Sequence, residues 1–70
     1  MYIVLEIQAN GDRASVLDPV CKSELNEAMS EYHRILSCAA ISSVEKHAAV
    51  VLTETGAKVS GEYYEHPHED

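Results

Sequence analysis

His47-Ala48-Ala49-Val50-Val51-Leu52-Thr53 is the stretch of sequence that decides the fold. The middle of this stretch is apolar at successive positions, so an extended chain would carry apolar side chains on both faces. That pattern is typical of a central strand that is covered on two sides. The chain offers one amphipathic helix, and one helix covers one face of a sheet. We therefore predict a sheet whose second face needs another cover.

Two strands are predicted near the start of the chain. Residues 2–9 alternate between an apolar face and a mixed face, as a strand with one face in the core does. Asn10-Gly11 follows, and this pair favours a tight hairpin turn because both residues tolerate positive φ angles. The returning strand is expected at residues 14–17 and at the sheet edge, because Pro19 cannot donate a ladder hydrogen bond.

One amphipathic helix is predicted after these strands. Ser23 is expected to cap it, with Glu24 and Glu27 in the first turn, where the helix dipole favours negative charge. Apolar residues then recur with the helical period, at Leu25, Ala28, Met29, Tyr32, Ile35, Leu36 and Ala39. On the opposite face, Glu31 and Arg34 are spaced to pair weakly across one turn.

A second hairpin completes the predicted fold. Thr55-Gly56 supplies its turn, and the last strand is expected at residues 58–66. We predict an α+β domain of the ββαββ type over residues 1–66, with four antiparallel strands in the order 2-1-3-4 and the helix on one face. The helix is expected to cover Ile3, Leu5, Ile7, Val50 and Leu52. Residues 67–70 are expected to form a flexible acidic tail that contains a histidine.

The second face of this sheet is predicted to bind another molecule. It would carry Tyr2, Val4, Ala49, Val51 and Tyr63, a patch more apolar than an isolated monomer exposes comfortably. A domain of 70 residues buries a thin core, so it gains stability from a partner subunit. A homodimer or a higher homo-oligomer is the simplest cover, because closed symmetric assemblies dominate among oligomers.

Composition narrows the class of partner. The chain has 12 Asp and Glu against 5 Lys and Arg, a net charge of −7, which opposes direct binding to nucleic acid or to anionic membranes. A host protein with a basic surface would be attracted. No apolar run approaches the ~20 residues that cross a bilayer, and the first eight residues do not resemble a signal peptide. Because Cys21 and Cys38 fall in no paired motif, we expect reduced thiols and a cytoplasmic protein.

Histidines and cysteines are the residue types that could carry chemistry. None of the four histidines lies in a spaced metal motif, and His66-Pro67-His68 supplies two ligands where structural zinc takes four. Cys38 falls in the C-terminal half of the predicted helix, where the dipole disfavours a thiolate, and no motif surrounds Cys21. We therefore expect no metal, no cofactor and no catalytic residue.

Several strings in the sequence resemble a known group of proteins. They are Tyr32-His33-Arg34-Ile35-Leu36, Ala39-Ala40-Ile41-Ser42-Ser43, the run from His47 to Gly56, and Tyr64-Glu65-His66. Together they resemble a family of very small proteins encoded in phages and mobile elements of Firmicutes, and the resemblance covers nearly the whole chain. It implies a mobile-element context and singles out Tyr32, His33, His47 and His66 as positions to examine.

Six residues are candidates for contact with a ligand or a partner: Tyr32, His33, His47, Tyr63, Tyr64 and His66. Tyr63 and Tyr64 would offer one ring to each face of the last strand, and aromatic rings at a subunit junction could enclose a flat ligand. The expected function is that of a small non-enzymatic accessory protein of a phage or mobile element, which self-associates and binds a macromolecule, as a counter-defence inhibitor does. One alternative is an oligomer that sequesters a small signalling nucleotide. Another is a domain with a Cys/His or metal site.

Overall fold

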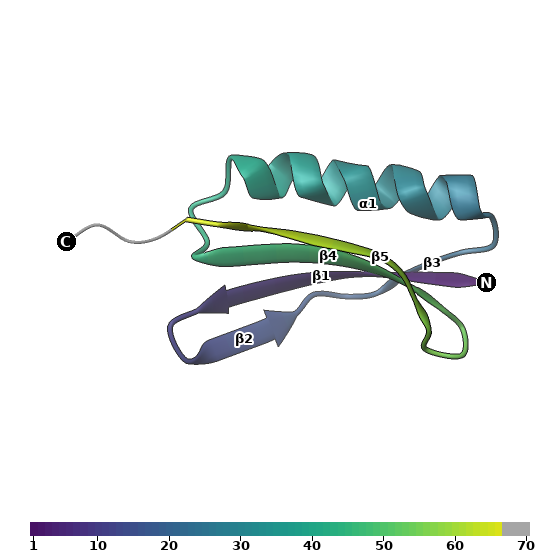
Figure 1. The fold of residues 1–70 in the computed structure, drawn as a ribbon, viewed down its shortest axis with the longest axis horizontal. Coiled ribbons are helices and arrows are strands. Elements are labelled where there is room, and N and C mark those ends of the chain that lie inside the picture. The colour runs from purple at the N-terminus through teal and green to yellow at the C-terminus, as the bar shows by residue number, and fades with distance from the viewer. Residues whose placement is uncertain (67–70) are drawn as a thin grey trace.

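The computed structural model describes residues 1–66, which form two layers: a sheet and a single helix laid along one of its faces (Figure 1). The elements are β1 (Tyr2–Asn10), β2 (Arg13–Val16), β3 (Val20–Lys22), α1 (Leu25–Ala40), β4 (Lys46–Thr53) and β5 (Lys58–Glu65). The prediction of an α+β fold with one helix on an open antiparallel sheet is confirmed. The tail expected at residues 67–70 lies outside the described residues.

The sheet has five strands, where the sequence predicted four. Its path is β2-β1-β4-β5, and β3 lies off this path because it also pairs with β1. β4 pairs with β1 from Ala9 to Tyr2 and with β5 along its other side, so it is central, as its apolar sequence indicated. The expected order 2-1-3-4 is therefore changed in detail by the added strand.

β2 and β3 are two halves of one interrupted edge strand. The first half ends in a hydrogen bond from the Leu17 N–H to the Glu6 carbonyl oxygen at 2.9 Å. Three residues then separate Val16 from Val20, whereas two separate their partners on β1, so one extra residue bulges from the edge. Pro19 lies in this bulge, where its missing N–H breaks no ladder.

Helix α1 follows the predicted apolar stripe, and its buried residues are Ala28, Tyr32, Ile35 and Ala39. The expectation that Ser23 caps the helix is wrong, because the N-cap residue is Glu24, which makes no side-chain capping hydrogen bond. Instead, the Asn26 Oδ1 accepts a hydrogen bond from the Glu27 N–H at 3.0 Å, which satisfies one of the free donors of the first turn.

The first hairpin turn is shifted by one residue from its predicted position. Asn10 pairs with Arg13, so the two central residues are Gly11 and Asp12 rather than Asn10 and Gly11. Gly11 has a φ of 61°, and no other residue of this turn has a positive φ, as in a type II′ turn. Asn10 instead accepts a hydrogen bond from the Glu45 N–H at 3.0 Å, which ties the hairpin to the start of β4.

The helix covers the opposite face of the sheet from the one predicted. Val4, Ala49 and Val51 lie beneath it with 1%, 0% and 0% of their surface exposed, and Tyr2 packs against this cluster. Ile3, Leu5, Ile7, Val50 and Leu52, which the helix was expected to cover, are only partly buried. The expectation for both faces is therefore wrong.

The position of the turn and the handedness of the chain explain this reversal. When the turn of a hairpin moves by one residue along the chain, the side chains of each strand exchange faces of the sheet. The turn at Gly11-Asp12 therefore sets which side chains of β1 point to each face. β3 and β4 both run antiparallel to β1, so β3-α1-β4 is a crossover between parallel strands. Such crossovers are right-handed in nearly all proteins, and here that path places the helix over Val4, Ala49 and Val51.

The second hairpin turns at Gly56, which has a φ of 92°, as predicted for Thr55-Gly56. The pairing of β4 with β5 is irregular near this turn, because Leu52 lies opposite Lys58 while Val51 lies opposite Ser60. This bulge at Val59 moves Lys58 to the same face as Gly61 and Tyr63. Simple alternation along the strand would place Lys58 on the other face, with Ser60 and Glu62.

Candidate functional site: the open face of the sheet

The sheet face opposite α1 is an apolar surface that the helix leaves uncovered. We call it the open face, and its central residues are Ile3, Leu5, Ile7 and Ala9 on β1 with Ala48, Val50 and Leu52 on β4. All seven are neither buried nor fully exposed. They are cross-strand neighbours in the β1-β4 ladder, so they form one continuous surface. The sheet thus has a second apolar face that the helix does not cover, on the side opposite to the one predicted.

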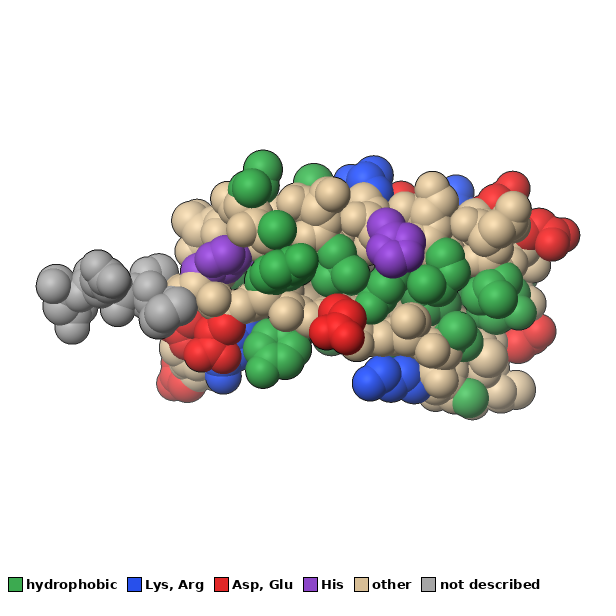
Figure 2. All heavy atoms as spheres, turned by 45° about the horizontal axis from the view of Figure 1, so that its top comes forward, with side chains coloured by type: hydrophobic (Ala, Val, Ile, Leu, Met, Phe, Trp, Pro, Cys, Tyr) green, Lys and Arg blue, Asp and Glu red, His purple; other side chains and the backbone are tan. Residues whose placement is uncertain are grey.

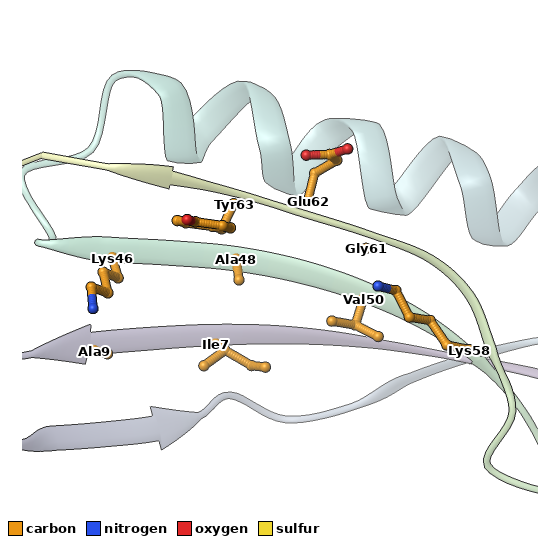
Figure 3. A pocket seen from close by; sticks show the side chains of 9 residues that line it. All are labelled: Ile7, Ala9, Lys46, Ala48, Val50, Lys58, Gly61, Glu62 and Tyr63. Atoms are coloured by element: carbon orange, nitrogen blue, oxygen red, sulfur yellow. The ribbon is translucent and has the colours of Figure 1, made fainter.

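A hollow of about 510 Å³ lies on the open face (Figure 3). Its lining residues are Ile7, Ala9, Lys46, Ala48, Val50, Lys58, Gly61, Glu62 and Tyr63. In Figure 3, Ile7, Val50 and Tyr63 lie on the side away from the helix, whereas Glu62 points toward α1. The hollow thus has an apolar floor, with a tyrosine and the ammonium groups of two lysines at its rim.

The side chain of Lys58 lies across Gly61. A Cβ atom built on Gly61 would be 2.8 Å from Lys58 Cε and 3.4 Å from Lys58 Nζ, so the missing side chain of Gly61 makes the space for the lysine (Figure 3). Within residues 1–66, no carboxylate forms a salt bridge with Lys58. An ammonium group is therefore held over the apolar floor without an anionic partner in this part of the chain.

Tyr63 is the candidate that the structure places on the open face. Its side chain is 60% exposed, and it lies opposite Ala48 on β4. Tyr64 lies on the other face, opposite His47, and is also exposed. The prediction that the two tyrosines lie on opposite faces of the last strand is thus confirmed.

Tyr32 and His33 stand next to each other on α1 but have different surroundings. Tyr32 is a core residue under the helix, and His33 is exposed. Their rings meet edge to face, with centroids 5.2 Å apart. Tyr32 therefore serves packing, and it is not available to a ligand.

His47 is a polar residue that is buried within the described chain. It is 4% exposed, and its Nε2 lies 2.5 Å from Glu6 Oε2, while Nδ1 has no hydrogen-bond partner among residues 1–66. The Gln8 side-chain amide also donates to Glu6 Oε2, at 3.4 Å. Sequence analysis missed Glu6, although a carboxylate inside an apolar strand was a signal that it needed a partner.

His66 is bound to the end of the helix. Its Nε2 lies 2.9 Å from the carbonyl oxygen of Ala39, and its backbone N–H donates to the carbonyl of Glu45 at 2.6 Å. The residue therefore fastens the end of β5 to α1 and to the start of β4. His68, the second histidine of the weak metal candidate, lies outside the described residues.

The interface candidates chosen from sequence fall on both sides of the sheet. Val4, Ala49 and Val51 are buried in the chain's own core, so these three are wrong as interface residues, while Tyr2 packs beside them and is partly buried. Tyr63 remains accessible on the open face. The reversal of the sheet faces described above is the physical reason for this correction.

Glu31 and Arg34 form the ion pair predicted on the outer side of α1. The Arg34 Nε donates to Glu31 Oε2 at 2.9 Å, and Nη2 also reaches Oε1 of the same carboxylate. These hydrogen bonds hold the pKa of Glu31 below its ordinary value and raise the pKa of Arg34. Any stability from the pair is present above the pKa of Glu31 in the unfolded chain and is lost as the pH falls through its folded value.

Replacing Arg34 with Gln is expected to raise the pKa of Glu31 toward that of an unpaired glutamate. The reason is that the variant removes the charged donor that stabilises the carboxylate. NMR titration of the Glu31 side-chain carboxyl carbon in the wild-type and variant chains measures this shift. An unchanged Glu31 titration would show that the pair does not form in solution.

The structure shows no cluster of metal-binding side chains in the part of the chain that it describes. No group of three or more His, Cys, Asp and Glu side chains gathers there. Cys21 and Cys38 are both exposed and free.

Within residues 1–66, no helix has the length and apolar character needed to cross a membrane. The chain matches no family model, no curated protein and no solved structure.

Proposed function

We propose that the chain is a small non-enzymatic accessory protein of a phage or mobile element, which self-associates through the open face of its sheet and binds a macromolecular partner. The continuous apolar surface of β1 and β4 is the observation that carries this proposal. The resemblance to small mobile-element proteins supports the setting. The exposed glutamates at the start of α1, Glu24 and Glu27, favour a partner with a basic surface.

A second copy of the chain is the occupant that fits the open face. The flat area of the face follows from the dimensions of the sheet. Four strands spaced by roughly 4.8 Å, each about eight residues long with a rise of ~3.3 Å per residue, cover roughly 500 Å². Side chains corrugate this surface, so its accessible area approaches the ~800 Å² that each partner buries in a standard interface. A domain of 70 residues also has a thin core, which makes the added apolar burial valuable.

Replacing Ile7 with Asp is expected to separate the copies without unfolding the protomer. Ile7 lies on the open face, where a carboxylate remains hydrated in the monomer but would lose its water between two sheets. Sedimentation equilibrium and circular dichroism, measured at several protein concentrations, separate the two effects. We expect the mass of the assembly to fall, with the helix and strand signal kept.

Ser30→Asp is the matched control for this variant. Ser30 is exposed on α1, so the same added charge lies away from the open face and should leave the assembly unchanged. If the assemblies of wild-type and Ile7→Asp chains have the same mass, the open face is not a contact between copies and the proposal fails.

A further inference from the structure

The outer edge of β5 presents a continuous row of unpaired backbone groups. The His66 N–H donates to Glu45, so these two residues form a hydrogen-bonded pair of the β4-β5 ladder. Because such pairs alternate in an antiparallel ladder, Tyr64 and Glu62 direct their N–H and C=O groups toward β4. Gly61, Tyr63 and Glu65 therefore direct theirs away from the sheet. β5 is the last strand on this side, so no strand within residues 1–66 pairs with them.

The two edges of the sheet differ in how well they are protected. On one side, β2 and β3 are four and three residues long and are separated by the bulge at Pro19, which prevents a further strand from pairing along the whole edge. On the other side, β5 is eight residues long and contains no proline. In Figure 2, hydrophobic side chains form an exposed band along the side of the molecule where α1 adjoins this edge. The β5 edge therefore has the features of a pairing site.

We propose that β5 pairs antiparallel with β5 of a second copy, about a twofold axis at Tyr63. A twofold axis at Glu62 would set this carboxylate directly opposite its own copy, which is unfavourable. An axis at Gly61 would draw the bulge near Val59 into the pairing. With the axis at Tyr63, the two Tyr63 residues face each other, and Gly61 lies opposite Glu65 of the second copy.

Charge complementarity supports this register. The Lys58 side chain lies across Gly61, with its ammonium group near the position where a Cβ of Gly61 would be. Glu65 of the second copy lies opposite Gly61, so its carboxylate reaches the ammonium group that has no anionic partner within residues 1–66 of its own chain. The twofold axis repeats this ion pair, so each edge contact contains two of them.

This contact is independent of the one through the open face and goes beyond the proposed function. The edge contact has its twofold axis perpendicular to the sheet, whereas the open-face contact has its axis parallel to it. Two perpendicular twofold axes that intersect generate a closed assembly of four copies. Each contact alone would give a dimer. The mass of the assembly shows whether one or both contacts form, and the residues whose amide hydrogens are protected from exchange show whether the edge contact is among them.

Amide hydrogen exchange followed by NMR tests the edge contact on the wild-type chain. We expect the N–H groups of Gly61, Tyr63 and Glu65 to exchange at least about 100-fold more slowly than in an unstructured peptide, as slowly as their neighbours Glu62 and Tyr64. Exchange at the unstructured rate for these three, with Glu62 and Tyr64 protected, would overturn the proposal. The same measurement on Ile7→Asp should keep the protection, because that variant alters the open face alone.

A charge exchange tests the register. Glu65→Lys is expected to weaken the edge contact at least about tenfold in sedimentation, because the introduced ammonium group would face Lys58 of the second copy. The double variant Lys58→Glu/Glu65→Lys should restore it, whereas Asp12→Lys, with the same charge change in the β1-β2 turn, should have no effect. Failure of the double variant to restore association would exclude the register centred on Tyr63.

Discussion

Val51→Asp is expected to unfold the protein, whereas the same substitution at the neighbouring Val50 leaves it folded. Val51 is fully buried beneath α1, where an unpaired carboxylate costs several kcal/mol. That cost is comparable to the whole stability of a small domain, about 5 kcal/mol at the low end. Val50 lies on the open face, where its carboxylate variant stays in water in the monomer. Circular dichroism and urea unfolding measure the difference.

The pair Val51→Ala and Val50→Ala keeps this comparison measurable if Val51→Asp does not yield folded protein. The alanine variant at Val51 leaves a cavity beneath the helix and should lose more unfolding free energy than the one at Val50. The opposite order for either pair would place the helix on the face of Val50 and contradict the assignment of the two faces.

Glu6→Ala is expected to lower the free energy of unfolding by about 1–3 kcal/mol, the usual cost of leaving a buried polar group without its partner. The group left behind is the His47 imidazole, whose Nε2 lies 2.5 Å from Glu6 and whose Nδ1 already lacks a partner within residues 1–66. With Glu6 gone, neither ring nitrogen of a side chain that is 4% exposed would have an acceptor or donor in that part of the chain. Urea unfolding at pH 7 measures the loss.

Glu6→Gln is the matched variant for this test. Its side-chain oxygen can accept a hydrogen bond from a neutral imidazole, so it should retain most of the stability that Glu6→Ala loses. Gln8→Ala, which removes only the longer 3.4 Å contact to Glu6, should have a small effect. If Glu6→Ala and Glu6→Gln are equally stable, the pair of Glu6 and His47 does not contribute to the fold.

Local patterns were sufficient for most of the elements. The helical period predicted α1 because its stripe contains the residues that become buried, and the apolar run at residues 47–53 predicted the central strand β4. The short strand β3 was missed because Val20–Lys22 is three residues long and follows a proline, so its pairing depends on β1 rather than on its own pattern.

The candidate site shows the same division. Tyr63 was recognised from sequence because it is adjacent to Tyr64, and adjacent residues of a strand point to opposite faces. The position of Lys58 on the open face does not follow from simple alternation, because a bulge shifts the alternation by one residue and nothing in the local pattern marks that shift. Glu6 became the partner of the buried His47, 41 positions away, because β1 and β4 pair in a register that brings the two side chains together.

The amino-acid sequence by itself determined that this protein has one amphipathic helix, a central strand that is apolar on both faces, and too little helix to cover both. Only the tertiary structure decided which face is covered. β4 is apolar on both faces, so its periodicity does not distinguish them, and the more apolar face of β1 is the one that the helix leaves uncovered. The choice follows from a one-residue shift in the turn at Gly11-Asp12 and from the right-handed path of the chain between β3 and β4.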